Sequence, residues 1–304
     1  MTAPLSTRQY KKRASNVTGR IHMKIGFIGL GKMGSVMAPH LADQATNIIG
    51  YDLNWQLPAE SPIKRAASLP EVSDCNIIFT MLPDGMIVKE IIAALLGLGT
   101  QALFVDMSSC HPETSTQLAK LLAPTGHSAI DAPVSGGVAK ARDGRLMIMT
   151  GGAQADFDRA RPLLEAMGKP VHIGPAGAGY AMKALNNYVS AAGLVTSFQA
   201  LATAQKFGIA PENFQTIINA STGRNNTTEV KIDKFVLTEA FDSGFALNLM
   251  AKDVSIASDI IAENGYMLPL TSELADYLKE ALEALGGDPD HTEIYRHLEH
   301  LAAK

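Results

Sequence analysis

Three glycines stand at the spacing of a phosphate-binding loop. They follow a short apolar run and precede a helical pattern, in the segment Gly29-Leu30-Gly31-Lys32-Met33-Gly34. In such a loop the first glycine allows a tight turn, the second lets the backbone approach a pyrophosphate, and the third lets the helix pack closely on the strand. The helix N-terminus also favours negative charge. The six residues therefore predict a dinucleotide site.

An acidic residue follows this loop at the expected distance. Asp52 ends the next apolar run, about 20 residues further along the chain. A carboxylate there can accept hydrogen bonds from the adenosine ribose hydroxyls and would repel a 2′-phosphate, so Asp52 favours NAD over NADP. The same residue could also form an Asx turn, because Tyr51-Asp52-Leu53-Asn54 has the form of a strand end.

Two later strand ends also carry polar residues. The hydroxyls of Ser108 and Ser109 could contact a ligand, or could cap the helix expected from Pro112. Further on, Ser135 is followed by Gly136 and Gly137. Two successive glycines leave backbone N–H groups uncovered, which predicts an anion-binding turn beside the Ser135 hydroxyl.

A lysine stands just after a glycine-rich turn. Lys183 lies in an otherwise apolar helical pattern, and Asn187 is four residues further on and therefore on the same helix face. A desolvated lysine at such a place can transfer a proton near neutral pH. A lysine in an apolar helix can also simply extend its charged end into water. Both interpretations are open on spacing alone.

The first part of the chain, which holds most of these residues, alternates between predicted strands and predicted helices. Apolar runs at 24–29, 47–52, 76–82, 102–107, 128–131, 146–150 and 171–174 predict strands. Between them, patterns at 32–43, 86–96, 112–122 and 156–167 predict helices, with a short one after the capping box that begins at Ser68. This alternation is typical of a doubly wound parallel sheet with crossover helices.

After Gly179 the strand patterns end. Helical patterns follow at 180–207, 211–220, 249–264, 270–285 and 293–302. We therefore expect an α/β domain at 23–179 and an all-helical domain at 180–304. Residues 1–22 contain five basic residues and no acidic one. We expect them to lie outside the fold, either as a transit peptide or as an extension ahead of Met23.

Composition limits the classes of partner. The net charge of −4 argues against a nucleic-acid partner, and no apolar run approaches the roughly 20 residues of a membrane helix. Cys75 and Cys110 lack the spacing of a zinc site or a disulfide framework, so we expect no metal. A reducing compartment is therefore expected, which is the cytoplasm, or the mitochondrial matrix if residues 1–22 are a transit peptide.

Four ordered motifs together resemble the β-hydroxyacid dehydrogenase family. Residues 27–38 resemble its N-terminal signature, 131–137 match its DAPVSGG segment, 177–187 match its GxGxxxKxxNN segment, and Lys252-Asp253 matches a late KD pair. The resemblance spans 23 to roughly 285. It implies a Rossmann-type domain followed by an all-α domain, as in 6-phosphogluconate dehydrogenase, and a homodimer or homotetramer formed through the helical domain.

The resemblance also implies roles for individual residues. Lys183 would be the general acid/base that serves the oxidation of a small β-hydroxy acid to its semialdehyde or ketone. Ser135, Gly136 and Gly137 would hold the substrate carboxylate, and Asn187 would position the substrate. The remaining family positions, which would line the cofactor beside the glycine loop, are Leu82, Pro83, Ser109 and Lys252.

Several alternatives remain open. Arg224, in the polar loop at 221–228, could meet a second acidic group on the substrate, Asn225 and Asn226 could meet a substrate hydroxyl, or the loop could be a solvated turn. A 6-phosphogluconate dehydrogenase would be much longer and would have a histidine in place of Asn186, and imine reductases usually lack the lysine. A succinic-semialdehyde-type reductase and a non-catalytic dinucleotide-binding module are further alternatives.

Overall fold

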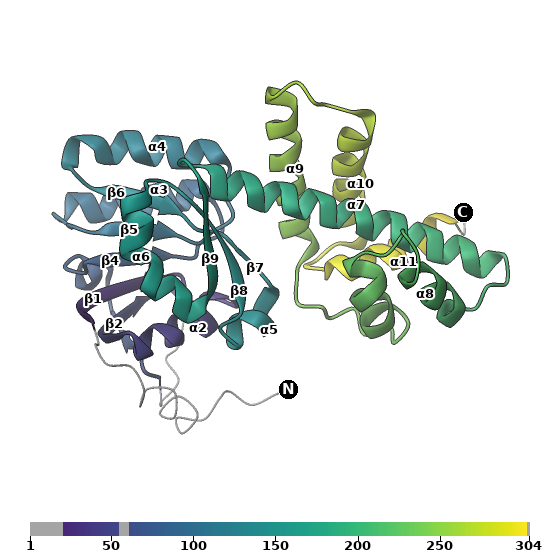
Figure 1. Cartoon of the computed structure of the whole chain (residues 1–304), viewed down its shortest axis with the longest axis horizontal. Helices are drawn as coiled ribbons and strands as arrows, with labels where there is room; N and C mark the ends of the chain where they lie inside the picture. The colour runs from purple at the N-terminus through teal and green to yellow at the C-terminus, as the bar shows by residue number, and fades with distance from the viewer. Residues whose placement is uncertain (1–20, 55–60, 303–304) are drawn as a thin grey trace. The chain divides into compact units, whose positions relative to one another are not determined.

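The computed structural model describes residues 21–54 and 61–302 (Figure 1). The chain divides into two compact units, Met1–Lys183 and Ala184–Lys304. The boundary falls inside one long helix, α7 (Ala178–Lys206). The basic segment at 1–20 lies outside the described residues, and β1 begins at Ile21.

The first unit is built on one sheet with the order β3-β2-β1-β4-β5-β6-β8-β7, and β9 pairs with β8. The strands are β1 (Ile21–Ile28), β2 (Ala45–Tyr51), β3 (Lys64–Arg65), β4 (Ile77–Thr80), β5 (Leu103–Asp106), β6 (Ser128–Asp131), β7 (Val134–Ser135), β8 (Leu146–Gly151) and β9 (Gly168–Gly174). The pairs from β3 to β6 are parallel. The order 3-2-1-4-5-6 is that of a doubly wound sheet, which opens a crevice at the carboxyl ends of β1 and β4.

Two strands, β8 and β9, depart from the expected parallel direction. β8 runs antiparallel to β6 and β7 and parallel to β9. The connection from β7 to β8 spans only 136–145, which is shorter than the dozen or more residues that a parallel crossover needs. The chain therefore turns back beside itself at this edge of the sheet.

Helices cover both faces of the sheet. They are α2 (Gly34–Met37), η2 (Ala38–Asp43), η3 (Leu69–Val72), α3 (Gly85–Gly97), α4 (Pro112–Leu122), η4 (Ala123–Thr125), α5 (Gly137–Arg142) and α6 (Gln154–Met167). Successive residues of β4 alternate between two cores, since Ile77 and Phe79 join one that includes α6, while Ile78 joins another that includes α3 and α4. Burial on both faces explains why these strands read as continuous apolar runs. The predicted doubly wound architecture is confirmed.

The second unit is helical. Beyond the second part of α7 it contains α8 (Pro211–Asn219), η5 (Thr227–Val236), α9 (Leu247–Glu263), α10 (Pro269–Leu285), η6 (His291–Glu293) and α11 (Ile294–Ala302). Its core joins α7, α9, α10 and α11, with Phe198, Val254, Leu278 and Ile294 fully or almost fully buried. Apart from an isolated bridge between Ala246 and Asp290, its described residues form no β-structure. Among the described residues, no helix is long and apolar enough to cross a membrane.

Candidate functional site

The glycine loop has the geometry that its spacing predicts. Gly29 has a φ of +92°, and a β-carbon there would clash with the Met81 carbonyl oxygen. A β-carbon on Gly34 would clash with the Gly29 carbonyl oxygen, so the turn closes only with glycine at both places. A β-carbon on Gly31 would meet no atom within 4 Å, which leaves that side of the loop open. These residues fit a dinucleotide whose pyrophosphate approaches the loop at Gly31.

Asp52 holds this loop against the end of β2. One carboxylate oxygen accepts a hydrogen bond from the Leu30 N–H at 2.7 Å, and the other accepts one from the Asn54 N–H at 2.8 Å. The second bond is that of an Asx turn, so the prediction that Asp52 could form such a turn at the strand end is confirmed. The ribose interaction stays a prediction. Within the loop, Leu30 is buried, Met33 is half-buried and Lys32 is exposed.

The carboxyl ends of β4 and β5 are joined by a buried network centred on Asp106. The Leu82 N–H donates to the Ser108 hydroxyl oxygen at 2.8 Å, and that hydroxyl donates to Asp106 at 2.6 Å. Asp106 also accepts from the Thr80 hydroxyl at 2.7 Å and from the Tyr180 hydroxyl. Burial raises the pKa of Asp106 and raises the pKa of Tyr180 well above its ordinary value. Ser108 therefore positions the backbone at Leu82.

Two further predicted cofactor positions lie at the same strand ends. Pro83 follows β4 and is exposed, and Ser109 follows β5 and is half-buried. The capping interpretation of the serines is wrong, because the N-cap residue of α4 is His111, whose ring nitrogen accepts from the Glu113 N–H at 3.2 Å. Because β4 and β5 are parallel, these positions share one edge of the sheet with the glycine loop after β1.

The predicted anion-binding turn joins β7 to α5. Ser135 ends β7 half-buried, and the next two residues have positive φ angles, +141° at Gly136 and +66° at Gly137. A β-carbon on Gly136 would lie 2.8 Å from the Lys140 side chain, whereas the space beside Gly137 is open. Glycine is the residue that adopts both angles without strain. The turn can therefore present backbone N–H groups beside the Ser135 hydroxyl.

The lysine and the asparagine of the third motif both lie on α7. Lys183 is half-buried in the second turn of the helix, and Asn187 is buried. The Asn187 side-chain amide donates to Asp253 on α9 at 2.6 Å, and the Lys252 ammonium lies 3.8 Å from the same carboxylate. Asp253 thus connects two predicted site residues within the second unit. Sequence reasoning did not assign it a role, although its place in the KD pair was a usable signal.

The polar loop at 221–228 is tied into the second unit. The Asn225 amide donates to the Ser197 hydroxyl at 2.9 Å, and its oxygen accepts from the Thr227 N–H at 2.8 Å, at the start of η5. Arg224 is exposed and its guanidinium lies 3.6 Å from Glu229. These contacts support the turn interpretation for Asn225.

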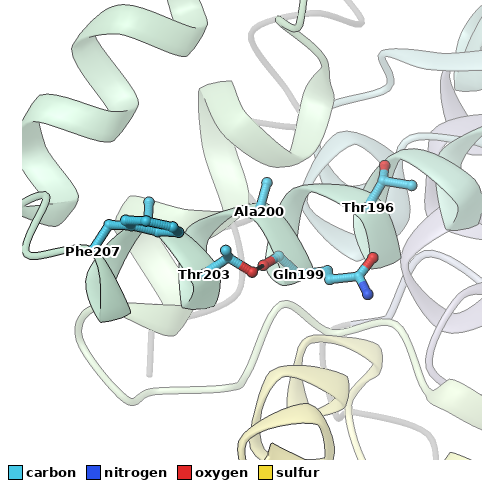
Figure 2. Close-up of a pocket in the computed structure, with 6 residues that line it drawn as sticks. Thr196, Gln199, Ala200, Thr203 and Phe207 are labelled. Atoms are coloured by element: carbon cyan, nitrogen blue, oxygen red, sulfur yellow. Dashed lines mark hydrogen bonds between the residues drawn. The ribbon is translucent and has the colours of Figure 1, made fainter.

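A hollow on α7 lies apart from the predicted site residues. Figure 2 shows the hollow, which lies along one side of the helix and is lined by Thr196, Gln199, Ala200, Thr203, Ala204 and Phe207. None of the predicted site residues lines it. Across 21–54 and 61–302, no group of three or more His, Cys, Asp or Glu side chains is placed to hold a metal ion.

Comparison with known families covers nearly the whole described chain. Residues 24–177 match a family model described as the NAD binding domain of 6-phosphogluconate dehydrogenase. Residues 177–298 match a model described as NAD-binding of NADP-dependent 3-hydroxyisobutyrate dehydrogenase. The two matches meet at Gly177, at the turn that precedes α7.

Individual relatives agree with these models. The chain is 35% identical to a 2-(hydroxymethyl)glutarate dehydrogenase of Eubacterium barkeri, over 87% of this chain and 90% of that protein. It is 30% identical to the mitochondrial 3-hydroxyisobutyrate dehydrogenase of Drosophila melanogaster, over 89% and 88% of the two chains. A solved 3-hydroxyisobutyrate dehydrogenase of Mycobacterium tuberculosis, determined with L-serine, has a TM-score of 0.80 at 31% identity and covers 91% of this chain and 99% of its own.

Proposed function

This chain belongs to the β-hydroxyacid dehydrogenase family, and we propose that it interconverts a small β-hydroxy acid and its semialdehyde or ketone, with Lys183 as the general acid/base. The observation that carries the proposal is the half-buried Lys183 in the second turn of α7, in a unit that also holds the glycine loop and the Ser135 turn. A lone dinucleotide module has no need of this combination.

The residues divide the work in a definite way. Bound NAD supplies the hydride acceptor. The Lys183 amine takes the proton of the substrate hydroxyl during oxidation and returns it during reduction. The Ser135 hydroxyl and the N–H groups of Gly136 and Gly137 hold the substrate carboxylate, which orients the reacting carbon. Asn187, held by Asp253, positions the substrate beside the lysine.

The cofactor half of the site is made by the glycine loop and its neighbours. The N–H groups of the loop receive the pyrophosphate, and Asp52 receives the adenosine ribose, which makes NAD the preferred cofactor over NADP. The tie between Asp52 and the Leu30 N–H supports this role, because it keeps the carboxylate beside the loop. The residues that line the rest of the cofactor are Leu82, Pro83, Ser109 and Lys252.

The substrate is 3-hydroxyisobutyrate or 2-hydroxy-3-oxopropionate. The names of the Drosophila and Mycobacterium relatives support the first compound. The Eubacterium relative is named for a hydroxy acid with two carboxylates, and Arg224 could accept a second carboxylate of this kind. These compounds therefore form the first set of substrates to test.

The test is a spectrophotometric screen for formation or consumption of NADH. It covers 3-hydroxyisobutyrate, tartronate semialdehyde, 2-(hydroxymethyl)glutarate, L-serine, L-threonate and 4-hydroxybutyrate. Lys183→Ala should lower kcat on the best substrate by about 10²- to 10⁴-fold, because the proton acceptor is lost. Binding of NADH, measured by fluorescence titration, should be unchanged.

The matched control is Lys206→Ala, which removes an exposed lysine from the end of the same helix. It should leave kcat unchanged. Full activity in Lys183→Ala would refute the mechanism. A wild-type chain that binds NADH but turns over no compound in the set would favour the non-catalytic module.

Two wider properties complete the proposal. The chain acts in the cytoplasm, or in the mitochondrial matrix if residues 1–22 are a transit peptide, as the mitochondrial name of the Drosophila relative supports. It works as a homodimer or homotetramer formed through the helical unit. Phe207, which is exposed and lines the hollow on α7, supports association at that surface.

A further inference from the structure

A buried carboxylate from the sheet caps the helix that carries Lys183. Asp131 ends β6 and is 1% exposed. One of its oxygens accepts from the Gly177 N–H at 2.7 Å and from the Ser115 hydroxyl at 2.8 Å, and the other accepts from the Tyr180 N–H at 3.1 Å. The first N–H groups of a helix have no partner within the helix and carry partial positive charge. Asp131 therefore supplies a cap that is 46 residues away from Gly177 in the sequence.

Two glycines make room for this carboxylate. A β-carbon on Gly151 would lie 2.6 Å from an Asp131 carboxylate oxygen, and a β-carbon on Gly179 would lie at the same distance from the same atom. The Gly179 β-carbon would also clash with the Met149 carbonyl oxygen. The first turn of α7 thus packs against the sheet at a distance that only glycine permits.

A second buried carboxylate, Asp106, holds the same turn through a hydrogen bond from the Tyr180 side chain. Tyr180 is 1% exposed, and its hydroxyl donates to Asp106 at the end of β5. Asp106 also accepts from Thr80 on β4 and from Ser108. The main chain at Tyr180 is therefore held from β6, while its side chain is held from β4 and β5.

We infer that Asp131 and the Asp106–Tyr180 pair are the positioning residues of Lys183. The inference rests on the function proposed above, in which Lys183 transfers the proton. Tyr180 lies three residues before Lys183 and so on the same side of the helix. The hydrogen bonds to Asp131 and Asp106 anchor this turn at two points, and fix its position along the helix axis and its rotation about that axis. The turn lies at the carboxyl ends of the strands, where the glycine loop also lies. A displacement of about 1 Å in a reacting group can cost about 10²-fold in rate.

Two substitutions separate the anchors. In Asp131→Asn the side chain keeps its size, but one carboxylate oxygen becomes an NH2 group, which cannot accept a hydrogen bond. Either the Gly177 N–H or the Tyr180 N–H therefore loses its acceptor. Tyr180→Phe removes one hydroxyl and leaves the ring in place. Asp131→Asn should lower kcat about 10- to 100-fold, and Tyr180→Phe should lower it several-fold. In both variants the Kd for NADH should stay within twofold of the wild type.

The control is Ser128→Ala, on the same strand as Asp131. The Ser128 hydroxyl donates to Asp156 at 2.8 Å and touches neither anchor. Its kcat should match the wild type. A poorly placed lysine also makes proton transfer limit the rate more strongly, so the solvent deuterium isotope effect on kcat should rise in Asp131→Asn and Tyr180→Phe and not in Ser128→Ala.

These readouts separate positioning from stability. Rates are expressed per NADH-binding site, so a variant that merely folds less well would show wild-type kcat and an unchanged isotope effect. That result in both anchor variants would overturn the inference. If Asp131→Asn yields no folded protein, Tyr180→Phe decides alone.

A measurement without substrate keeps the inference distinct from the proposed function. The rate at which acetic anhydride modifies Lys183 is followed by peptide mass spectrometry at fixed pH. This rate should change at least threefold in Asp131→Asn and stay unchanged in Ser128→Ala. A wild-type enzyme with no turnover would refute the function alone, whereas an unchanged Lys183 reactivity in both anchor variants would refute the positioning.

Discussion

Asp52 illustrates how one side chain can serve structure and recognition together. Its carboxylate accepts the Leu30 N–H and the Asn54 N–H, so it shapes the glycine loop before any ligand arrives. An ionised carboxylate can still accept further hydrogen bonds, because its two oxygens offer about four lone pairs. The Asx turn and the proposed ribose contact are therefore compatible.

Replacing this carboxylate should change the choice of cofactor. Asp52→Ser removes the negative charge that would repel a 2′-phosphate, so the ratio of kcat/KM for NADP to that for NAD should rise about tenfold, equivalent to about 1.4 kcal/mol. Steady-state kinetics with both cofactors measures the ratio. Asp74→Ser, which alters an exposed carboxylate paired with Lys24, serves as the control. An unchanged ratio in Asp52→Ser would remove the basis for the NAD preference.

At the scale of elements, the loop before α9 depends on one carboxylate. Asp290 accepts from the Ser243 hydroxyl at 2.8 Å, the Gly244 N–H at 2.8 Å and the Thr292 hydroxyl at 2.6 Å. Burial alone would raise the pKa of Asp290, but the hydrogen bonds from His291, Thr292 and Ser243 outweigh it and lower the pKa below its usual range. The start of α9, which carries Lys252 and Asp253, is therefore pinned to the segment before α11.

This lowered pKa predicts an acid-sensitive second unit. A carboxyl group with a depressed folded-state pKa contributes stability above its unfolded pKa of 3.8, and loses it as the pH falls towards the folded value. Lys231, whose pKa burial lowers to about 8, stays charged throughout this acid range. The wild-type Tm should therefore begin to fall below about pH 5 and should fall more steeply below pH 3.8.

Asp290→Asn provides the test by calorimetry. The variant should have a lower Tm than the wild type at pH 6, and a smaller fall in Tm between pH 5 and about pH 3. Burial lowers the pKa of His291, so its protonation also destabilises the fold in acid and leaves some pH dependence in the variant. Asp276→Asn, at an exposed site on α10, should behave like the wild type. Equal slopes in Asp290→Asn and the wild type would contradict the assignment.

At the scale of the whole molecule, each unit has its own core, and the helical unit leaves large apolar side chains uncovered. Phe207 is 83% exposed, Val189 is 68% exposed and Ile217 is 66% exposed. Val189 lies on α7, Phe207 directly follows that helix, Ile217 lies on α8, and exposed apolar side chains mark an interface between subunits where they form a contiguous patch. The proposed oligomer would cover them with a second copy of the chain.

Phe207→Glu tests this assembly. A buried charge without a partner is costly, so the variant should shift from the oligomer towards the monomer. Light scattering coupled to size-exclusion chromatography measures the mass. The control is Met86→Glu, which changes a side chain of the first unit that is 63% exposed and should leave the mass unchanged. A monomeric wild-type chain would contradict the proposal.

Much of this protein follows from local sequence. The expected helix at 112–122 coincides with α4, and the expected strand at 128–131 coincides with β6. The expected helix at 32–43 instead begins at Gly34 and tightens into η2, where Pro39 lacks the N–H that a regular helix needs. Three short elements were not predicted from the sequence, namely the two-residue strands β3 and β7 and the six-residue helix α5. Such short elements leave almost no periodic pattern in the sequence.

Sequence alone determined which chemistry is available, because glycine spacing, periodicity and motif order are local properties of the chain. The family, the doubly wound sheet and the helical second half followed from them. Only the tertiary structure decided how the candidate residues are held. Asp131 meets Gly177 and Tyr180, Asp106 meets Tyr180 across 74 positions, and Asp253 meets Asn187 across 66. Such pairs are set by how strands and helices pack, and residue spacing carries no trace of them.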